Sequence, residues 1–280
     1  MASVKSPIRR FLKPLLYRLM GPKGYFLAQV YGKTRDIRNR LVEEPEMALL
    51  DRLVCPGDDV IDIGANFGYY AVRLADLVGS GHVYAFEPIP FTHDVCARVL
   101  QNFRAGNTEL FQKGVGEKAG DVTFSVPLQE FGALSAGQAH MSGRENSLDK
   151  KVYNFASHTS FTCDVVTIDE FLLPRLQNLS FIKMDIEGAE LFALRGMQQT
   201  LEKFRPTVLI EIEPEFLGGF GIKEADLTTF FADAGYKAYL YDSGTDRLQE
   251  HSAGKPYCSS NYILIHKDKE RVFSGLLAAA

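Results

Sequence analysis

The sequence predicts an α/β protein with one open, mostly parallel sheet of seven strands, helices on both faces and further helices at the N-terminus. Strand-like apolar segments alternate with helix-like segments from about residue 45 onward, which is typical of parallel sheets built from βαβ units. Two adjacent strands close the series, which indicates a final hairpin with one strand antiparallel to the rest. The chain has 280 residues, 46% of them hydrophobic, enough for one large domain with a full core.

The individual elements follow from hydrophobic periodicity and from glycine and proline at their ends. Two helices, at residues 7–20 and 41–54, precede the core. The seven core strands are expected at residues 59–63, 82–86, 110–115, 180–184, 207–212, 237–241 and 261–266. The connecting helices are expected at residues 69–78, 92–103, 188–201 and 224–234, with shorter strands at 122–126 and 162–167. Thr167 or Asp169 is expected to cap one more helix, which Pro174 ends.

Residues 127–160 are polar, contain glycine and show no periodicity. A long segment of this kind inside a compact domain is more often functional than idle, so we predict a lid or substrate loop. An ill-ordered surface insertion is the alternative. His140 and His158 lie in this segment as candidate bases, although a loop histidine is commonly a solvent-exposed residue with no catalytic role.

The N-terminal arm, residues 1–43, differs from the rest of the chain in charge. Its first 40 residues contain ten basic side chains and one acid, Asp36, whereas the whole chain carries a net charge of −4. Apolar residues recur in this arm at helical spacing, namely Phe11, Leu12, Leu15, Leu16, Leu19 and Met20. Two interpretations stay open: an amphipathic helix packed on the domain, or a surface that meets anionic lipid or an acidic substrate.

The remaining composition narrows the class of protein. The four cysteines form no C-x-x-C pair, which argues against a zinc cluster or a disulfide framework and favours a reducing cytoplasm. No apolar run approaches the roughly 20 residues of a membrane span, and Lys13 and Arg18 interrupt the apolar stretch that a signal peptide needs. The acidic core argues against nucleic acid as a partner. We expect a cytoplasmic protein, peripheral at a membrane if the arm binds lipid, and the oligomeric state stays open.

The most informative segment is VIDIGANFGYY, at residues 60–70. A strand runs into a turn that contains Gly64 and Gly68, a helix follows, and the next strand ends at Glu87. This order is that of a nucleoside-binding βαβ unit, in which glycine lets the backbone approach the ligand and the acid accepts hydrogen bonds from ribose hydroxyls.

Other residues of the turn argue against NAD. Counted from Gly64, the dinucleotide fingerprint needs glycine at the positions of Asn66 and Tyr69. Their side chains crowd the approach of a pyrophosphate to bare backbone amides. A nucleoside without a phosphate fits better, and S-adenosylmethionine is the common one. Asp62, two residues before Gly64, favours this cofactor over a merely structural glycine turn.

A second segment, FIKMDIEGAE at residues 181–190, brings acids to the end of a strand, where open α/β sheets bind ligands. Asp185 ends this strand, Glu187 lies on the following turn, and the next strand delivers Glu211 to the same rim. A carboxylate there can take the proton of a hydroxyl that attacks a cationic sulfonium. Alternatively, several carboxylates can hold a hard divalent cation such as Mg²⁺. Glu190 also fits a structural role in the first turn of a helix.

Taken in order, these motifs resemble the FkbM family of S-adenosylmethionine-dependent methyltransferases. The matching segments are VIDIGANFGYY, VYAFEPIP, VVTIDEFL, FIKMDIEGAE and RPTVLIEI, together with Asn261 in SSNYILIHK. The resemblance covers residues 44–266 and implies a Rossmann-like class I methyltransferase fold. It makes residues 44–270 the methyltransferase domain, between the arm and a C-terminal tail at residues 271–280.

The resemblance also implies O-methylation of a hydroxyl on a sugar, glycolipid or natural product, so the partner is a small-molecule, glycan or lipid-linked acceptor. The cofactor-binding residues that it implies are Asp62, Gly64, Asn66, Gly68, Glu87, Asn102, Gly114 and Asp185. Asp185, Glu187 and Glu211 would face the acceptor as catalytic residues. Glu187 and Glu211 would occupy the positions of magnesium ligands in some related sugar O-methyltransferases.

Two other functions compete with O-methylation. Enzymes that methylate nitrogen on nucleobases commonly carry N/D-P-P-Y/F at the strand end that here reads Asp185-Ile186-Glu187-Gly188, so the sequence argues against them. A non-catalytic cofactor-binding module would be indicated by lost turn glycines or a lost ribose acid, and this chain keeps both.

Overall fold

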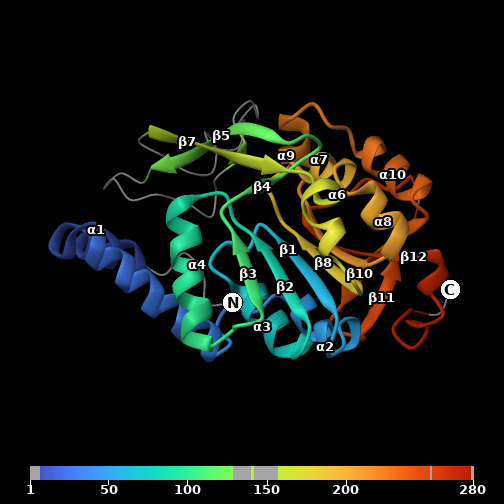
Figure 1. Ribbon diagram of the computed structural model, residues 1–280, viewed down its shortest axis with the longest axis horizontal. Helices are drawn as coiled ribbons and strands as arrows, with labels where there is room; N and C mark the ends of the chain where they lie inside the picture. The colour runs from blue at the N-terminus through green and yellow to red at the C-terminus, as the bar shows by residue number, and fades with distance from the viewer. Residues whose placement is uncertain (1–6, 129–139, 142–156, 253, 279–280) are drawn as a thin grey trace.

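An eight-stranded mixed sheet forms the centre of the molecule, in the order β11-β10-β12-β9-β8-β1-β2-β3 (Figure 1). The computed structural model describes residues 7–128, 140–141, 157–252 and 254–278. The strands of this sheet are β1 (Asp59–Ile63), β2 (His82–Phe86), β3 (Thr108–Phe111), β8 (Leu179–Met184), β9 (Thr207–Ile212), β10 (Tyr236–Asp242), β11 (Arg247–Glu250) and β12 (Ser260–His266).

Strands β3, β2, β1, β8 and β9 run parallel, and β12 is antiparallel to both of its neighbours, β9 and β10. The predicted α/β class, with an antiparallel strand at the end of the series, is therefore confirmed. The sheet has eight strands rather than the predicted seven because β11 pairs with the edge of β10. Sequence patterning does not reveal β11, since its residues RLQE contain a single buried side chain, Leu248.

Helices cover both faces of the sheet, and β1 shows how its residues divide between them. Val60 packs in a cluster with helix α3, whereas Ile61 and Ile63 pack in a cluster with α7 and α8. The first face carries η1 (Pro45–Leu49), α2 (Leu50–Leu53), α3 (Tyr69–Val78) and α4 (Pro90–Phe103). The second carries α6 (Ile168–Phe171), α7 (Glu190–Arg195), α8 (Gln198–Phe204), α9 (Pro214–Gly219) and α10 (Glu224–Asp233).

The N-terminal helix α1 (Pro7–Arg38) is longer than the predicted helix at residues 7–20. It is interrupted at Gly21, where φ is 65° and ψ is −177°, and its second part packs on α4, with the rings of Tyr25 and Phe91 stacked 6.0 Å apart. The helix predicted at residues 41–54 is wrong in extent. Proline cannot donate a helical hydrogen bond, and Pro45 begins only a short 3-10 turn, η1, before α2.

A smaller sheet lies beside the carboxyl ends of the central strands, in the order β4-β7-β5-β6 (Figure 1). Its strands are β4 (Gly114–Val115), β5 (Gly120–Leu128), β6 (His140–Met141) and β7 (Ser157–Val166). The strand predicted at residues 110–115 is therefore divided between the two sheets. The prediction of an irregular segment at residues 127–160 is wrong at both of its ends and at residues 140–141, because the chain forms strands there. His140 lies opposite Ser125 in the pairing of β6 with β5, and His158 lies opposite Pro127 in the pairing of β7 with β5. The rest of the predicted lid, residues 129–139 and 142–156, lies outside the described residues.

Two of the predicted helices also differ in detail. Residues 188–201 form α7 and α8 rather than one helix, because Gly196 at the break lies against the backbone of Gly116, whose carbonyl oxygen would be 2.0 Å from an added Cβ. Thr167 is the cap of α6, since its Oγ1 accepts a hydrogen bond from the amide of Glu170. Asp169 instead accepts bonds from the start of α8, and Leu173–Arg175 forms the 3-10 turn η3.

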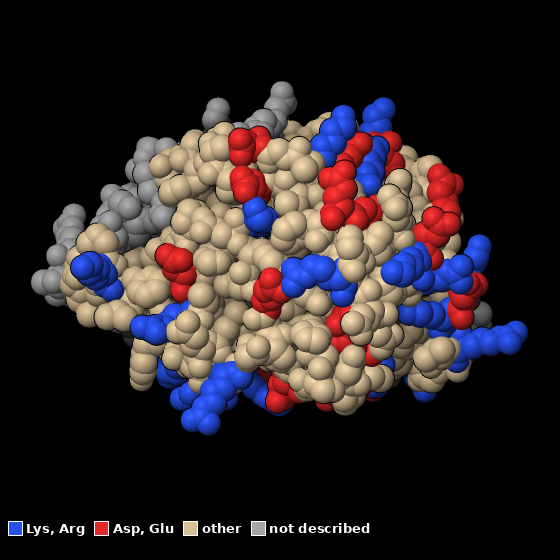
Figure 2. All heavy atoms as spheres, viewed as in Figure 1, with Lys and Arg blue, Asp and Glu red and all other residues tan. Residues whose placement is uncertain are grey.

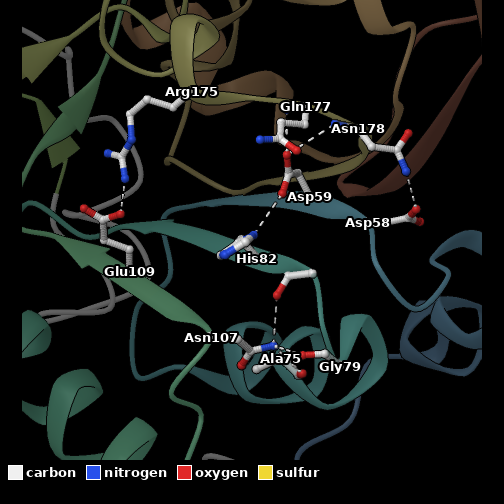
Figure 3. A network of polar contacts seen from close by, with 11 residues as sticks. Asp58, Asp59, Ala75, Gly79, His82, Asn107, Glu109, Arg175, Gln177 and Asn178 are labelled. Atoms are coloured by element: carbon white, nitrogen blue, oxygen red, sulfur yellow. Dashed lines mark hydrogen bonds and ion pairs between the residues drawn. The ribbon is translucent and has the colours of Figure 1, made fainter.

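Polar contacts join neighbouring segments at the amino ends of the parallel strands, away from their carboxyl ends (Figure 3). The Asp59 carboxylate accepts hydrogen bonds from the amides of Gln177 and Asn178. The Asp58 carboxylate accepts from the Asn178 side chain at 3.0 Å, and Asn107 donates to the carbonyls of Ala75 and Gly79. These acids hold the start of β1 against the start of β8, so they are occupied in fixing the fold and leave the carboxyl edge for function.

Candidate active site

The candidate site lies at the carboxyl edge between β1 and β8. The chain moves from β1 outward to β2 and β3, and then returns to place β8 on the other side of β1. This reversal is the topological switch point at which open α/β sheets bind ligands. Glu87 and Asp185 directly follow β2 and β8, and Asp62 and Glu211 are the last but one residues of β1 and β9.

The glycine turn after β1 is held against the end of β2 by backbone hydrogen bonds. The amides of Gly64 and Ala65 both donate to the carbonyl of Phe86, each at 2.9 Å. Asn66 and Gly68 have left-handed φ values of 49° and 86°, and Gly68 begins α3. The turn thus presents backbone toward the rim.

Gly64 touches the acidic strand end directly. A Cβ atom at Gly64 would lie 1.9 Å from the carbonyl oxygen of Asp185, and the Asp185 amide donates to the carbonyl of Ile63 at 3.0 Å. No side chain fits in this space, so only glycine lets the turn and the acidic strand end meet.

Glu87 is 5% exposed and faces the turn from the end of β2. Its Oε2 accepts a hydrogen bond from the amide of Asn66 and its Oε1 from the amide of Ile89, both at 2.9 Å. Burial raises the pKa of this carboxyl to about 7, against the opposing effect of the two amides. Because a carboxylate has about four acceptor positions, ribose hydroxyls can still donate to it.

Asp62 lies deeper, at 1% exposure, and its Oδ2 has no hydrogen-bond partner among the described residues. Burial raises the pKa of Asp62 to about 7, with Lys183 opposing the shift and Asp185 adding to it. A cavity of about 100 Å³ opens beside it. The described residues that line the cavity are Val42, Glu44, Met47, Asp62, Gly64, Ala65, Asn66, Tyr69, Tyr70, Lys183 and Asp185.

Lys183 is a site residue that the sequence analysis missed. It is 2% exposed, lies opposite Asp62 in the register of β1 and β8, and has its Nζ 5.0 Å from the centre of the Tyr70 ring. Its Nζ also lies 3.4 Å from Oδ1 of Asn261. A cation inside the apolar run FIKM was the available signal, because a buried lysine needs nearby acids or acceptors.

A hydrogen-bond network connects this lysine to the segment before η1. The carboxylate of Glu44 accepts from the Tyr70 hydroxyl at 2.6 Å and from Nδ2 of Asn261 at 3.0 Å. The same Nδ2 lies 3.4 Å from Oε2 of Glu46, and burial raises the pKa of Glu46. The network closes the cavity on the side of α3 and fixes the segment that covers it.

The structure brings Asp185 and Glu211 together as a pair. Burial raises the pKa of Glu211, and a hydrogen bond and repulsion from Asp185 raise it further. Glu187, with a left-handed φ of 57°, adds repulsion from the turn. The pair therefore favours a shared proton, held mainly by Glu211, with Asp185 as the acceptor of its hydrogen bond.

Glu190 supports the turn between β8 and α7. It is 1% exposed, and its Oε1 accepts from the amides of Ile186 and Gly188, both at 3.2 Å. Burial raises its pKa to about 7. The structure thus agrees with a structural role for Glu190, which fixes the backbone between Asp185 and Glu187.

Asn102 and Gly114, two of the cofactor-binding residues that the resemblance implies, lie in α4 and in the smaller sheet. Asn102 is exposed in the last turn of α4, where its Nδ2 donates to Oγ1 of Thr34 at 3.0 Å. The helical rise puts it about 18 Å from the start of α4 beside the rim, so the structure does not bring Asn102 to the site. Gly114 is buried in the smaller sheet, where a Cβ would meet side chains of Val165 and Phe124 at 3.0 and 3.2 Å.

A metal could be held by clustered acids, histidines or cysteines. Within the residues that the structure describes, no three such side chains are grouped to hold a metal ion. Glu187 and Glu211 contribute two carboxylates to the rim, which is fewer than a dedicated protein site for a hard cation commonly supplies.

Comparisons with known proteins agree with the motifs. Residues 62–238 match the Methyltransferase FkbM domain. Hexuronic acid methyltransferase AglP of Haloferax volcanii is 26% identical over 223 residues, which are 79% of this chain and 81% of that protein. Methyltransferase 1 of Beauveria bassiana is 23% identical over 158 residues, 55% of this chain, and the match spans 64% of that relative.

Solved structures with partial similarity to this chain include a methyltransferase. The structure of methyltransferase FkbM from Methylobacillus flagellatus has 15% sequence identity and a TM-score of 0.46, and the match covers 84% of this chain and 58% of that one. The domain match extends over more than half of the sequence and contains the glycine turn, Glu87 and the acidic strand ends. The chain therefore belongs to the FkbM methyltransferase family.

Proposed function

We propose that the chain uses S-adenosylmethionine to methylate a hydroxyl group of a sugar, glycolipid or other natural product. The observation that carries this proposal is the contact between the glycine turn and the acidic strand end, where Gly64 touches the backbone of Asp185. A cofactor on the turn would therefore have its reactive end beside the paired acids.

The residues at the turn fit the cofactor chemically. Glu87 is held by two backbone amides in an orientation that leaves acceptor positions for ribose hydroxyls. The unpaired buried oxygen of Asp62 suits a cationic donor such as the α-ammonium group of the methionine part. When bound, S-adenosylmethionine supplies a methyl group on a positively charged sulfur.

The acid pair supplies the proton acceptor. The pKa of Glu211 is raised by burial and by Asp185, so Glu211 retains a proton at neutral pH and donates its hydrogen bond to Asp185. Asp185 then takes the proton from the acceptor hydroxyl as its oxygen attacks the methyl group. Glu187 contributes negative charge from the adjoining turn.

Two observations support a hydroxyl group of a sugar as the methyl acceptor. The relative from Haloferax volcanii carries the name of a hexuronic acid methyltransferase, and carboxylates at the rim suit hydroxyl rather than amine acceptors because a hydroxyl must lose its proton. A divalent cation between Glu187 and Glu211 is a second way to lower the pKa of the hydroxyl. Inhibition by EDTA that Mg²⁺ reverses would favour this version.

Methyl transfer to a panel of hexuronic acid, neutral sugar and glycolipid acceptors tests the proposal. Asp185→Asn should lower transfer by ~10²-fold or more while the affinity for S-adenosylhomocysteine changes little. Glu213→Gln is the matched control, because Glu213 is a neighbouring acid whose side chain accepts a hydrogen bond from the amide of Glu215 at the start of α9. Transfer to amines but not hydroxyls, or full activity of Asp185→Asn, would contradict the proposal.

A further inference from the structure

The exposed apolar side chains of the described residues are concentrated in one place. The large hydrophobic residues that are exposed are Met20, Leu27, Tyr31, Leu41, Val42 and Val272. Five of these six fall between residues 20 and 42. Single exposed hydrophobic residues are normal on a protein surface, whereas a contiguous group indicates an interaction site.

Helix α1 has separate inner and outer faces in this region. Its inner face is already occupied, since Tyr25, Val30 and Thr34 are no more than 8% exposed and Tyr25 stacks on Phe91 of α4. Its outer face carries Leu27 and Tyr31, which are 57% and 72% exposed. The inner residues secure the helix to the domain, so the outer apolar residues are not needed for packing.

Basic residues follow the same outer face. Arg35 and Arg38 continue the series from Leu27 and Tyr31 at intervals of four and three residues, which places all four on one side of the helix. Lys23 and Arg40 are also exposed. We call the set Lys23, Leu27, Tyr31, Arg35 and Arg38 the outer face of α1.

Acids are scarce in the segment of the sequence that carries this face. Between residues 20 and 42 the only acid in the sequence is Asp36, which is 6% exposed. The next acid, Glu43, pairs with Arg40 at 3.5 Å. Figure 2 shows Lys and Arg side chains gathered at the lower left of the molecule, over the lower ends of α1 and α4 in Figure 1.

A hollow of about 640 Å³ continues the outer face toward α3 and α4. Ile37, Val42 and Phe103 are among its apolar lining residues, and Arg38 and Arg104 are among its basic ones. Arg73 also lines it, but this arginine is paired with Asp51 at 2.5 Å. The lining of the hollow is mixed, since Glu43, Asp51 and Asp76 also belong to it, so the cationic and apolar chemistry is that of the helix face itself.

We propose that the outer face of α1 binds the surface of an anionic phospholipid bilayer. Leu27 and Tyr31 would enter the boundary between headgroups and acyl chains, and the basic residues would contact lipid phosphates. No helix of the described residues is long and apolar enough to cross a membrane. Nucleic acid would contact the basic residues but would not bury the exposed aliphatic side chain of Leu27, so a lipid surface fits the combination better.

Vesicle co-sedimentation of the full chain tests this proposal. The probes are phosphatidylcholine vesicles with and without roughly 30% phosphatidylglycerol, at about 0.05 M and about 0.5 M NaCl. We expect binding to the anionic vesicles, weakened by salt. Leu27→Ser/Tyr31→Ser and Arg35→Glu/Arg38→Glu should each lower the partition constant by about tenfold or more.

Val272→Ser is the matched control, because Val272 is 77% exposed and lies outside α1. The altered residues are all exposed, so thermal unfolding and cofactor affinity should not change, which separates this test from that of the proposed function. Absence of binding to anionic vesicles, or equal loss in Val272→Ser, overturns the proposal. A wild-type dimer that Leu27→Ser/Tyr31→Ser makes monomeric, without vesicle binding, would assign the face to a second copy and also overturn it.

Discussion

Glu87 is expected to act on both cofactor affinity and stability, and Glu87→Gln separates the two effects. The substitution keeps the volume of the side chain but removes its charge. Charge-assisted hydrogen bonds to the ribose contribute about 1.5–3 kcal/mol, so the dissociation constant for S-adenosylmethionine should rise about 10- to 150-fold.

The second effect follows from the two backbone partners of Glu87. Its oxygens accept from the amides of Asn66 and Ile89, whereas a glutamine side chain offers one oxygen and one NH₂ group. One of these amides would face a donor and lose its partner, which costs about 1–3 kcal/mol in a buried position. The free energy of unfolding should fall by this amount even without cofactor.

Titration calorimetry with S-adenosylmethionine and urea denaturation of the free protein measure the two effects. Glu109→Gln is a suitable control, because Glu109 is an exposed acid on β3 that pairs with Arg175. A folded Glu87→Gln protein with wild-type affinity would refute the ribose contact. Unchanged stability would refute the argument from the two amides.

Three further predictions concern the same edge of the sheet. Burial raises the pKa of Asp62 from its ordinary value near 4 to about 7, so the folded chain binds more protons than the unfolded chain between these values. The free energy of unfolding should therefore fall as pH rises through this window, by on the order of 4 kcal/mol from this group, and Asp62→Asn should flatten the slope in urea denaturation. Gly64→Ala should destabilise the fold by about 2 kcal/mol or more and abolish cofactor binding. Gly79 also has a positive φ, but no atom lies within 4 Å of a Cβ added there, so Gly79→Ala should cost only the backbone strain. Equal losses of stability in thermal unfolding of the two variants would contradict the contact between Gly64 and Asp185. Lys183→Met should leave buried Asp62 without its neighbouring cation and lower the free energy of unfolding above pH 7 by about 3–5 kcal/mol. A variant as stable as wild type would show that Lys183 does not stabilise Asp62.

The central strands could be predicted from the sequence because they are buried on both faces. Strands β1, β2 and β9 have the bounds that their apolar runs predict, residues 59–63, 82–86 and 207–212. Fully buried parallel strands read as continuous apolar segments with sharp ends. The acids at those ends reach one edge for the same reason, since parallel strands all finish on the same side.

Features that depend on distant pairing could not be predicted. Glu44 and Asn261 are bonded across 217 residues of sequence, and this contact exists only because β12 inserts between β9 and β10. Gly114 belongs to the smaller sheet because it pairs with Val165, 51 residues later. Asn102 was assigned to the site from motif order alone, although α4 carries it away from the rim.

The buried acids around the Gly64 turn also bear on how turnover ends. Methyl transfer turns the positively charged sulfonium into a neutral thioether, and in the proposed mechanism Asp185 gains the proton of the acceptor hydroxyl at the same time. At about 6 Å and an effective dielectric constant of 20, loss of one positive charge beside one carboxylate removes roughly 3 kcal/mol of attraction. The site would then hold S-adenosylhomocysteine less tightly than S-adenosylmethionine, and the acids would favour release of the spent cofactor.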